Sequence, residues 1–286
     1  EKKHPDFLVL ELSSYQLEQM SYRSFTCSVF TNFSEDHLER HKTLSSYFKV
    51  KTKIFQTASP EKSCGFWTSS VKDQAKQFGF FSKQNMPIKI VQSHTMLDVI
   101  PKTMLWPTHN KENAALALQA CSFLTSLPTE FLGKNLRGFK TINHRFQVIA
   151  KTQQSTFIDD SKATNIDATE AALKSLDKPT LLLLGGLSKG TDFSPLLKYK
   201  DKIQTLIAFG KANKEIKSVF QNKVPLISFQ NLAEAMENLK NLYKKNQTPY
   251  VLLSPGCASF DEFKNFSERG LFFTKSIITN FKEDLL

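Results

Sequence analysis

The sequence predicts an α/β fold in which parallel sheets form two domains. Its 286 residues suggest two domains, because a domain commonly contains about 150 residues. From residue 156 onward, short apolar strands alternate with helical segments, which is typical of right-handed crossovers between parallel strands. An apolar run near the start, at residues 7–10, has the composition of a strand buried on both faces. The polar stretch around residues 138–143 places the domain boundary near residue 142.

The first predicted domain, residues 1–142, begins with the strand at residues 7–10. Because a parallel strand needs neighbours, we expect the chain to start inside a domain. Ser13 and Ser14 then cap a short helix over residues 15–20. The further elements predicted here are a strand at 26–31, a helix with an apolar stripe at 45–57, short strands and loops over 60–107 with the clearest strand at 88–91, and an Ala-rich helix at 110–124 capped by Asn110 or Thr108.

The second predicted domain, residues 143–286, carries the regular alternation. Its predicted strands cover residues 156–159, 180–184, 205–209, 225–229 and 250–253, and its helical segments cover 167–175, 195–199, 214–220 and 232–243. In sheets of this kind, ligands bind at the carboxyl ends of the strands. The loops that follow these strands are therefore the first places to look for a site.

Composition narrows the classes of function. The chain has 38 Lys and Arg against 27 Asp and Glu, a formal charge of +11, but its lysines are scattered. Without a basic arm or a stacking motif, this charge favours an anionic small substrate over nucleic acid. No run of 18 apolar residues occurs, so we expect no membrane span. The four cysteines form no CxxC pair, which favours reduced thiols in the cytoplasm.

Three candidate sites lie in the first domain. Glu11 follows an apolar run and would place a carboxylate at a strand's carboxyl end, where it could hold Mg²⁺ or simply bond a neighbouring serine. The stretch 32–41 gathers metal-capable side chains after the second strand, although a solvated charged loop is the more economical interpretation. Asn110 and Asn113 share one face at a helix start, where they could meet a nucleotide or serve only as a cap.

The remaining candidates lie at the domain junction and in the second domain. Arg145 could reach the phosphates of a nucleotide, or form an interdomain ion pair. Loops at residues 158–165, 185–190 and 254–261 bring Lys, Thr and Ser to one sheet edge, which is a plausible cradle for an anion. The glycine turn at 185–190 lacks the spacing of a phosphate loop, and Cys257 lacks both a GxSxG setting and an evident histidine partner.

Taken together, these motifs resemble one family, the Mur ligases, over nearly the whole chain. They occur in the following order: residues 10–17 (Leu-Glu-Leu-Ser-Ser-Tyr-Gln-Leu), residues 32–41, His109-Asn110-x-x-Asn113, His144-Arg145-Phe146, Asp160-Ser161-Lys162-Ala163-Thr164-Asn165, Gly185-Gly186-x-x-Lys189-Gly190, and residues 254–270. Within the family, the stretches at 160–165 and 254–259 are most similar to the branch that adds D-glutamate.

The resemblance implies a partial P-loop-type central ATPase domain followed by a Rossmann-like, amino-acid-binding domain. In that family ATP and Mg²⁺ convert the carboxylate of a UDP-sugar substrate, here UDP-N-acetylmuramoyl-L-alanine, into an acyl phosphate. The amine of D-glutamate then attacks it, as a step of peptidoglycan synthesis. The family's phosphate loop and UDP-binding domain precede the part represented here, so we expect these 286 residues alone to be inactive. The resemblance also leads us to expect a cytoplasmic protein that acts as a monomer.

The resemblance also implies roles for individual residues. Glu11, His37 and Lys51 would hold Mg²⁺, with His37 and Lys51 serving catalysis and Lys51 carbamylated. An unmodified Lys51 would instead pair with Glu11. Nucleotide contacts would come from Asn110, Asn113, Arg145 and Asp160. The D-glutamate pocket would comprise Lys162, Thr164, Lys189, Ser259, Phe260 and Phe266.

Two alternatives stay open at this point. A folylpolyglutamate synthetase-like ligase has a similar architecture and also adds glutamate, although the stretches at 160–165 and 254–266 argue against it. A non-catalytic binding fragment would keep the nucleotide or amino-acid pocket without the phosphate loop.

Overall fold

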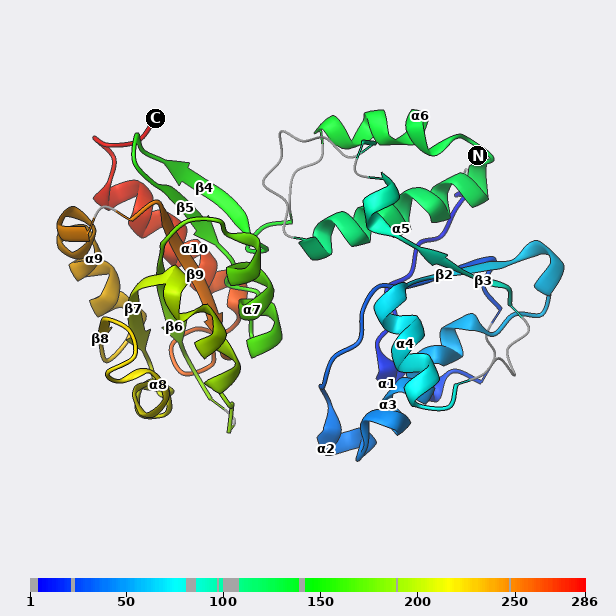
Figure 1. The fold of residues 1–286 in the computed structure, drawn as a ribbon, viewed down its shortest axis with the longest axis horizontal. Coiled ribbons are helices and arrows are strands. Elements are labelled where there is room, and N and C mark those ends of the chain that lie inside the picture. The colour runs from blue at the N-terminus through cyan, green and yellow to red at the C-terminus, as the bar shows by residue number, and fades with distance from the viewer. Residues whose placement is uncertain are drawn as a thin grey trace. The chain divides into compact units, whose positions relative to one another are not determined.

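The computed structural model describes residues 5–21, 24–80, 86–96, 98–99, 108–138, 142–188, 190–246 and 248–286 (Figure 1). The chain divides into two compact units, one formed by Glu1–Leu105 and His109–Phe139, the other by Trp106–Thr108 and Lys140–Leu286. Each unit has its own sheet and covering helices, and parallel pairing predominates in both. The predicted α/β class is therefore confirmed.

Within the described residues, the sheet of the first unit contains three parallel strands in the order β1-β2-β3. These strands are β1 (Cys27–Phe30), β2 (Cys64–Thr68) and β3 (Ile88–Val91). Strands β1 and β3 lie where the sequence predicts them. The prediction of mixed short strands over residues 60–107 did not separate β2 from the helix that follows it, α4 (Ser69–Gln77).

The first unit also contains helices and 3-10 turns. They are α1 (Ser14–Gln19), α2 (Leu38–His41), α3 (Leu44–Lys51), η1 (Thr52–Phe55), η2 (Pro60–Lys62), α4, η3 (Ser93–Met96), α5 (Thr108–Thr125), α6 (Thr129–Gly133) and η4 (Lys134–Gly138). Ser13 forms the predicted cap of α1, as a reciprocal capping box with Gln16. The helix predicted over residues 45–57 tightens from α3 into η1 at Thr52, whose N–H bonds the carbonyls of both Phe48 and Val50.

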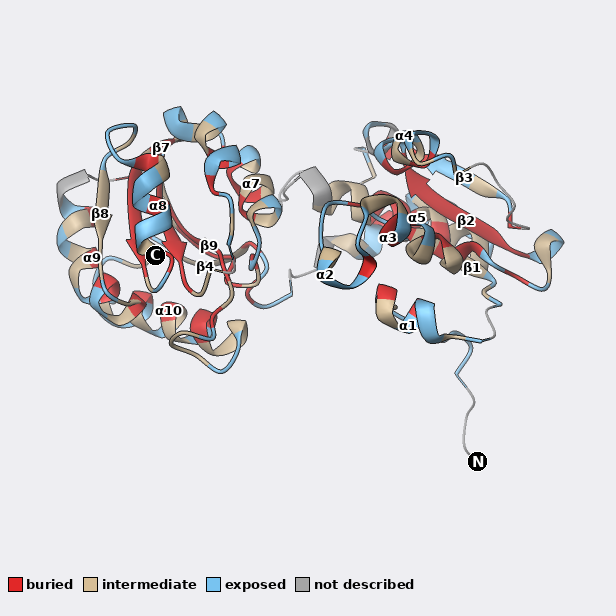
Figure 2. Cartoon of the chain, turned by 90° about the horizontal axis from the view of Figure 1, so that it is seen from below, coloured by how far each residue is buried: buried red, intermediate tan, exposed pale blue. Residues whose placement is uncertain are grey.

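The core of the first unit is unusually aromatic. Phe48 and Phe55 are fully buried, and Phe30 stacks on Phe48 with ring centroids 5.6 Å apart. Trp67 meets Phe55 edge to face at 5.6 Å. Strand β2 is red along its length in Figure 2 because all five of its residues are buried, and its Trp67 belongs to this cluster. This aromatic packing holds the loop after β1 and helix α3 together in one cluster.

The prediction of a buried strand at residues 7–10 is wrong. Phe7, Leu8, Val9 and Leu10 belong to no strand and are 54%, 77%, 92% and 53% exposed. The prediction rested on composition alone. A strand also needs backbone partners, and within the described residues this run has no ladder neighbour.

The second unit is built on a six-stranded sheet in the order β4-β5-β9-β6-β7-β8. Its strands are β4 (Gln147–Lys151), β5 (Thr156–Asp159), β6 (Thr180–Gly185), β7 (Ile203–Phe209), β8 (Leu226–Ser228) and β9 (Tyr250–Gly256). The five predicted strands are present and mutually parallel. Strand β4 was not predicted and runs antiparallel to β5 at the edge, with a bulge between Val148 and Ala150.

Helices pack on both faces of this sheet. They are α7 (Ile166–Ser175), the 3-10 helix η5 (Ser194–Lys202), α8 (Asn213–Phe220), α9 (Leu232–Asn246) and α10 (Phe266–Asn280). Strand β6 shows how they divide the core, since Leu182 and Leu184 join one buried cluster while Leu181 and Leu183 join the other. Helix α10 was not predicted. Among the described helices, none combines the length and apolarity that a membrane span requires.

Candidate functional site

In the first unit, His37 and Lys51 come together around one ring. His37 precedes α2 in the left-handed region, at φ 53°, and Lys51 is the last residue of α3. The Tyr47 ring lies 6.0 Å from the His37 ring, centroid to centroid, and 5.6 Å from Nζ of Lys51. Glu11, which is exposed, lies on the segment leading into α1.

Carboxylates surround this pair. Nε2 of His37 lies 3.6 Å from Asp36, and its Nδ1 lies 3.6 Å from Glu39. Burial lowers the pKa of Lys51, and the carboxylates of Asp36 and Glu11 partly oppose that change.

The structure shows no preformed metal cage at this place. Among the described residues, no three His, Cys, Asp or Glu side chains are arranged to hold a metal. The alternative pairing is absent as well, because Lys51 and Glu11 form no ion pair in the described structure. Metal binding by Glu11, His37 and Lys51 stays a prediction.

Several neighbours of His37 and Lys51 were given no individual role from the sequence, although His41 lies in the stretch 32–41 and Tyr15 in the motif at residues 10–17. The Tyr15 ring meets His37 edge to face at 5.2 Å, and His41 stacks on Tyr47 at 5.0 Å. Nε2 of the buried His41 lies 3.0 Å from the hydroxyl of Ser14. Burial raises the pKa of Tyr47 to about 12, so this phenol stays protonated at neutral pH. The stretch Tyr47-x-x-x-Lys51-x-x-Ile54, by which the family resemblance identifies Lys51, places Tyr47 and Lys51 four residues apart on one helix face.

The predicted nucleotide residues of the first unit lie on α5. Asn110 and Asn113 fall in its first two turns and are half-buried. Nothing in this unit tests their role, so nucleotide binding by them stays a prediction.

In the second unit, Asp159 is the last residue of strand β5 and Asp160 follows it directly. Asp159 lies 2.7 Å from Nδ1 of His144, accepts the N–H of Ser161 at 3.0 Å, and accepts the Thr274 hydroxyl at 3.3 Å. His144 and Asp159 are both buried. This pair joins the beginning of the unit to β5 and to α10.

Asp160 is held differently. One of its oxygens accepts the N–H of Phe146 at 3.0 Å, and the other accepts the Ser254 hydroxyl at 2.8 Å. Burial raises the pKa of this carboxyl to about 7, against the effect of both hydrogen bonds. Arg145 is exposed, and its charge also opposes the rise.

The loops after β5, β6 and β9 meet at one edge of the six-stranded sheet. The N–H of Gly256 bonds the carbonyl of Ala163 at 2.9 Å, and the N–H of Leu187 bonds the carbonyl of Ala258 at 2.8 Å. We call these segments, residues 160–165, 186–190 and 256–261, the strand-end loops. They carry most of the predicted D-glutamate residues.

The structure brings some of those residues together. Nζ of Lys162 lies 5.1 Å from the centre of the Phe266 ring. Ser259 is buried and opens a turn, since its carbonyl accepts the N–H groups of Glu262 and Phe263. Thr164 and Phe260 are exposed, the latter by 65%. The prediction for Lys189 lies outside the described residues.

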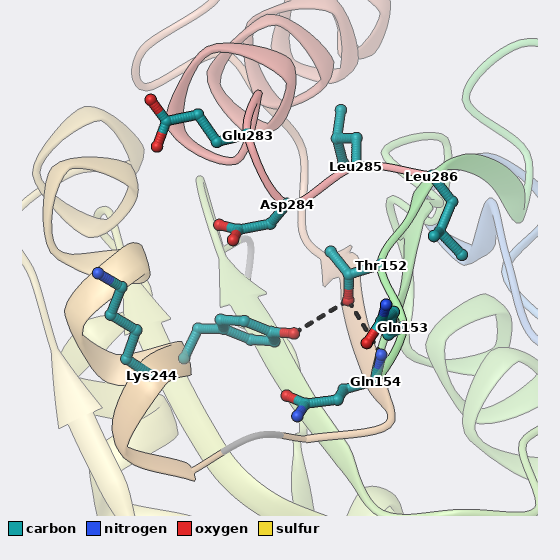
Figure 3. Close-up of a pocket in the computed structure, with 9 residues that line it drawn as sticks. Thr152, Gln153, Gln154, Lys244, Glu283, Asp284, Leu285 and Leu286 are labelled. Atoms are coloured by element: carbon teal, nitrogen blue, oxygen red, sulfur yellow. Dashed lines mark hydrogen bonds between the residues drawn. The ribbon is translucent and has the colours of Figure 1, made fainter.

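A separate cavity of about 470 Å³ opens in the second unit away from these loops (Figure 3). Its walls come from the β4–β5 turn, the end of α9 and the segment after α10, so it lies at the amino-terminal edge of the parallel strands. It is lined by Thr152, Gln153, Gln154, Tyr243, Lys244, Glu283, Asp284, Leu285 and Leu286. None of the predicted site residues lines it.

Comparison with known families agrees with this architecture. Residues 1–121 match the Mur ligase middle domain, and residues 144–257 match the Mur ligase, glutamate ligase domain. These are the two parts that the motifs predicted, in the same order. The chain belongs to the Mur ligase family.

Curated relatives place the similarity within that family. The chain is 33% identical to a UDP-N-acetylmuramoylalanine–D-glutamate ligase of Prochlorococcus marinus over 97% of its own length and 63% of the relative's. It is 32% identical to a protein of the same name from Caldanaerobacter subterraneus, over 96% of the chain and 64% of the relative. The chain thus spans less than two thirds of the length of these relatives.

Solved structures share the fold at low sequence identity. A pseudomurein peptide ligase type C from Methanothermus fervidus matches with a TM-score of 0.56 and 14% identity, over 90% of this chain and 64% of the other. A bifunctional folylpolyglutamate synthase/dihydrofolate synthase from Yersinia pestis matches with a TM-score of 0.55 and 14% identity, over 87% and 60%. Both similarities support the fold class.

Proposed function

We propose that this chain supplies the catalytic and amino-acid-binding parts of an ATP-dependent ligase that adds D-glutamate to UDP-N-acetylmuramoyl-L-alanine in cytoplasmic peptidoglycan synthesis. The observation that carries the proposal is the similarity to D-glutamate ligases over 97% of the chain, including the strand-end loops. We further propose that the protein acts as a monomer.

The chemistry follows from the weakness of a carboxylate as an electrophile. Transfer of the γ-phosphoryl group of ATP to the alanine carboxylate supplies a leaving group, and the D-glutamate amine then displaces phosphate to form the amide. Negative charge gathers in both steps, so Mg²⁺ and cationic side chains must offset it. Asn110, Asn113, Arg145 and Asp160 would position the nucleotide.

Glu11, His37 and Lys51 would hold one Mg²⁺ once Lys51 carries a carbamate. A neutral amine is the form that adds CO₂, with loss of one proton, and the lowered pKa of Lys51 favours that form. The carbamate would turn a cation into an oxygen ligand of the type that Mg²⁺ prefers. Incubation with ¹³C-bicarbonate should give a carbamate carbon signal that is absent in Lys51→Arg and retained in the exposed control Lys49→Arg.

The strand-end loops would bind D-glutamate. Lys162 and Lys189 would pair with its carboxylates, Thr164 and Ser259 would add hydrogen bonds, and Phe260 and Phe266 would flank the carbon chain. The contact of Lys162 with the Phe266 ring supports this assignment.

Calorimetric titration with D-glutamate tests the pocket. We expect Lys189→Ala and Ser259→Ala each to weaken binding by about tenfold or more, whereas the exposed control Lys200→Ala keeps the wild-type affinity. L-glutamate serves as the ligand control. Unchanged affinity in both pocket variants would contradict the assignment.

Turnover should need more than these residues. The sequence contains no GxxxxGK followed by Ser or Thr, so no phosphate loop of that form is available to hold the ATP phosphates. We expect the 286-residue chain to release no phosphate when it is mixed with ATP, Mg²⁺, D-glutamate and the sugar nucleotide. Release above the enzyme-free background would refute this expectation.

A further inference from the structure

Arg269 is a fully buried cation beneath the strand-end loops. It lies near the start of α10 with 0% of its surface exposed. Its Nε donates to the Ser161 hydroxyl at 3.0 Å, and its Nη2 donates to the Ser161 carbonyl at 2.8 Å. Its Nη1 donates to the Cys257 carbonyl at 3.0 Å. A single guanidinium therefore ties the loop after β5 to the loop after β9.

Both contacts lie next to residues of the proposed pocket. Ser161 immediately precedes Lys162, and its hydroxyl also donates to the carbonyl of Phe266 at 2.8 Å. Cys257 lies two residues before Ser259. Any displacement of the main chain at Ser161 or Cys257 would move the side chains that are expected to hold the amino acid.

The third loop packs against the same guanidinium. A Cβ added at Gly186 would lie 3.0 Å from Nη1 of Arg269 and 2.4 Å from the carbonyl oxygen of Ala258. Gly186 also has a φ of 126°, which an L side chain rarely adopts. The absence of a side chain at this position lets the loop after β6 close over Arg269.

The electrostatic setting of Arg269 is unusual for a buried cation. Its acceptors are two carbonyls and one hydroxyl, and no carboxylate of the described residues accepts its hydrogen bonds. Burial lowers its pKa to about 10, so the group stays charged at neutral pH, and Asp159, Asp261 and Glu262 act on it only through space. Burying a cation without a direct ion pair costs stability. This cost indicates that Arg269 serves a purpose other than stabilising the fold.

We propose that Arg269 is a positioning residue of the amino-acid site: it fixes the spacing between Ser161 and Cys257, and thereby the alignment of Lys162 with Ser259. The assignment of the ligand rests on the proposed function. The assignment of Arg269 rests on its own contacts. Lysine would preserve the charge, but it cannot supply three donors in the planar arrangement that these acceptors require.

The test compares Arg269→Lys with Phe273→Leu, a change at another fully buried residue of α10 whose side chain packs into the sheet-facing core. Two measurements are made on the whole chain. The first is D-glutamate affinity by calorimetry. The second is hydrogen exchange at the amides of Ala163, Leu187 and Gly256, whose hydrogen bonds report on the three loops.

We expect Arg269→Lys to weaken D-glutamate binding by at least about tenfold and to speed exchange at all three reporter amides. Phe273→Leu should lower the melting temperature while it leaves both readouts close to wild type. Guanidinium chloride at millimolar concentration should restore affinity to Arg269→Ala, whereas tetramethylammonium chloride should not.

The proposal is overturned if Arg269→Lys keeps wild-type affinity and loop protection, or if Phe273→Leu changes both as strongly. A wild-type chain that fails to bind D-glutamate contradicts the proposed function instead. In that case the exchange of Ala163, Leu187 and Gly256 still decides whether Arg269 holds the loops.

Discussion

At the scale of single residues, Asp160 couples the stability of the second unit to pH. An aspartate in an unfolded chain titrates near 4, whereas burial raises the pKa of Asp160 to about 7. Between these values the folded state binds a proton more tightly than the unfolded state. This carboxyl therefore favours folding at low pH, and its contribution is lost as the pH rises through about 4 to 7.

Asp160→Asn should remove this dependence, because an amide can keep partners at Phe146 and Ser254 without ionising. We expect the difference in melting temperature between about pH 5 and about pH 8 to shrink in the variant. The exposed Asp201→Asn serves as the control and should keep the wild-type difference. An equal difference in Asp160→Asn and wild type would show that another group titrates.

At Gly270, α10 packs tightly against His144 and Asp159. A Cβ at this position would lie 2.2 Å from Nδ1 of His144 and 2.8 Å from Oδ2 of Asp159. Alanine normally gains about 1 kcal/mol over glycine within a helix. Overpacking of a core costs about 1–3 kcal/mol, and here the clash falls on a buried hydrogen-bonded pair.

We therefore expect Gly270→Ala to lower the free energy of unfolding by about 1 kcal/mol or more, measured by urea titration. Leu271→Ala, at the exposed neighbouring position, provides the control and should change it little. A Gly270→Ala protein as stable as wild type would mean that His144 can move aside without cost.

At the scale of elements, Lys202 closes the carboxyl end of α7. Its Nζ donates to the carbonyls of Leu173, Lys174 and Leu176 at 3.2, 3.4 and 2.6 Å. A cation at this end bonds carbonyls at the end of the helix and opposes the helix dipole. Lys202→Met should reduce the free energy of unfolding by about 0.5–2 kcal/mol, as followed by circular dichroism in urea. The exposed Lys200→Met should stay within about 0.5 kcal/mol of wild type. A loss no larger than that of the control would show that water replaces the lysine.

The elements that were predicted well from the sequence are the strands whose residues are mostly apolar and buried. Strand β6 is buried along its whole length, and β5 coincides with its predicted bounds. Strand β4 escaped prediction because none of its residues is fully buried, as suits an edge strand. The exposed run at residues 7–10 is the opposite error, a strand that was predicted but does not form. Its apolar composition suits a buried strand, but composition alone does not show that the run has strand partners.

At the scale of the whole molecule, the second unit contains its own core. Among the described residues, the apolar clusters on the two faces of its sheet draw only on residues between Phe146 and Leu285. We expect residues 140–286, expressed alone, to unfold cooperatively and to give a dispersed amide NMR spectrum. The same fragment with Leu183→Ala, which opens a cavity in a fully buried position, should melt at lower temperature. A molten or insoluble wild-type fragment would contradict this expectation.

The candidate site could be predicted only in part, because its contacts depend on the strand order. Motifs along the chain indicated which loops matter, but the meeting of Lys162 with Phe266 follows from the packing of α10 beside β5. The burial of Arg269 against Ser161 was likewise not predicted from the sequence. The residue type gives the chemistry of a side chain, whereas residues far away in the sequence decide whether that side chain is buried.

The position of β9 has a consequence for synthesis on the ribosome. This strand occupies the middle of its sheet, pairing with β5 on one side and β6 on the other, although it is made last. Until Tyr250–Gly256 emerges, the nascent polypeptide holds two incomplete half-sheets with open hydrogen-bonding rims. Such intermediates attract other unfinished chains, so translation pauses before β9 should favour aggregation, and pauses after it should not.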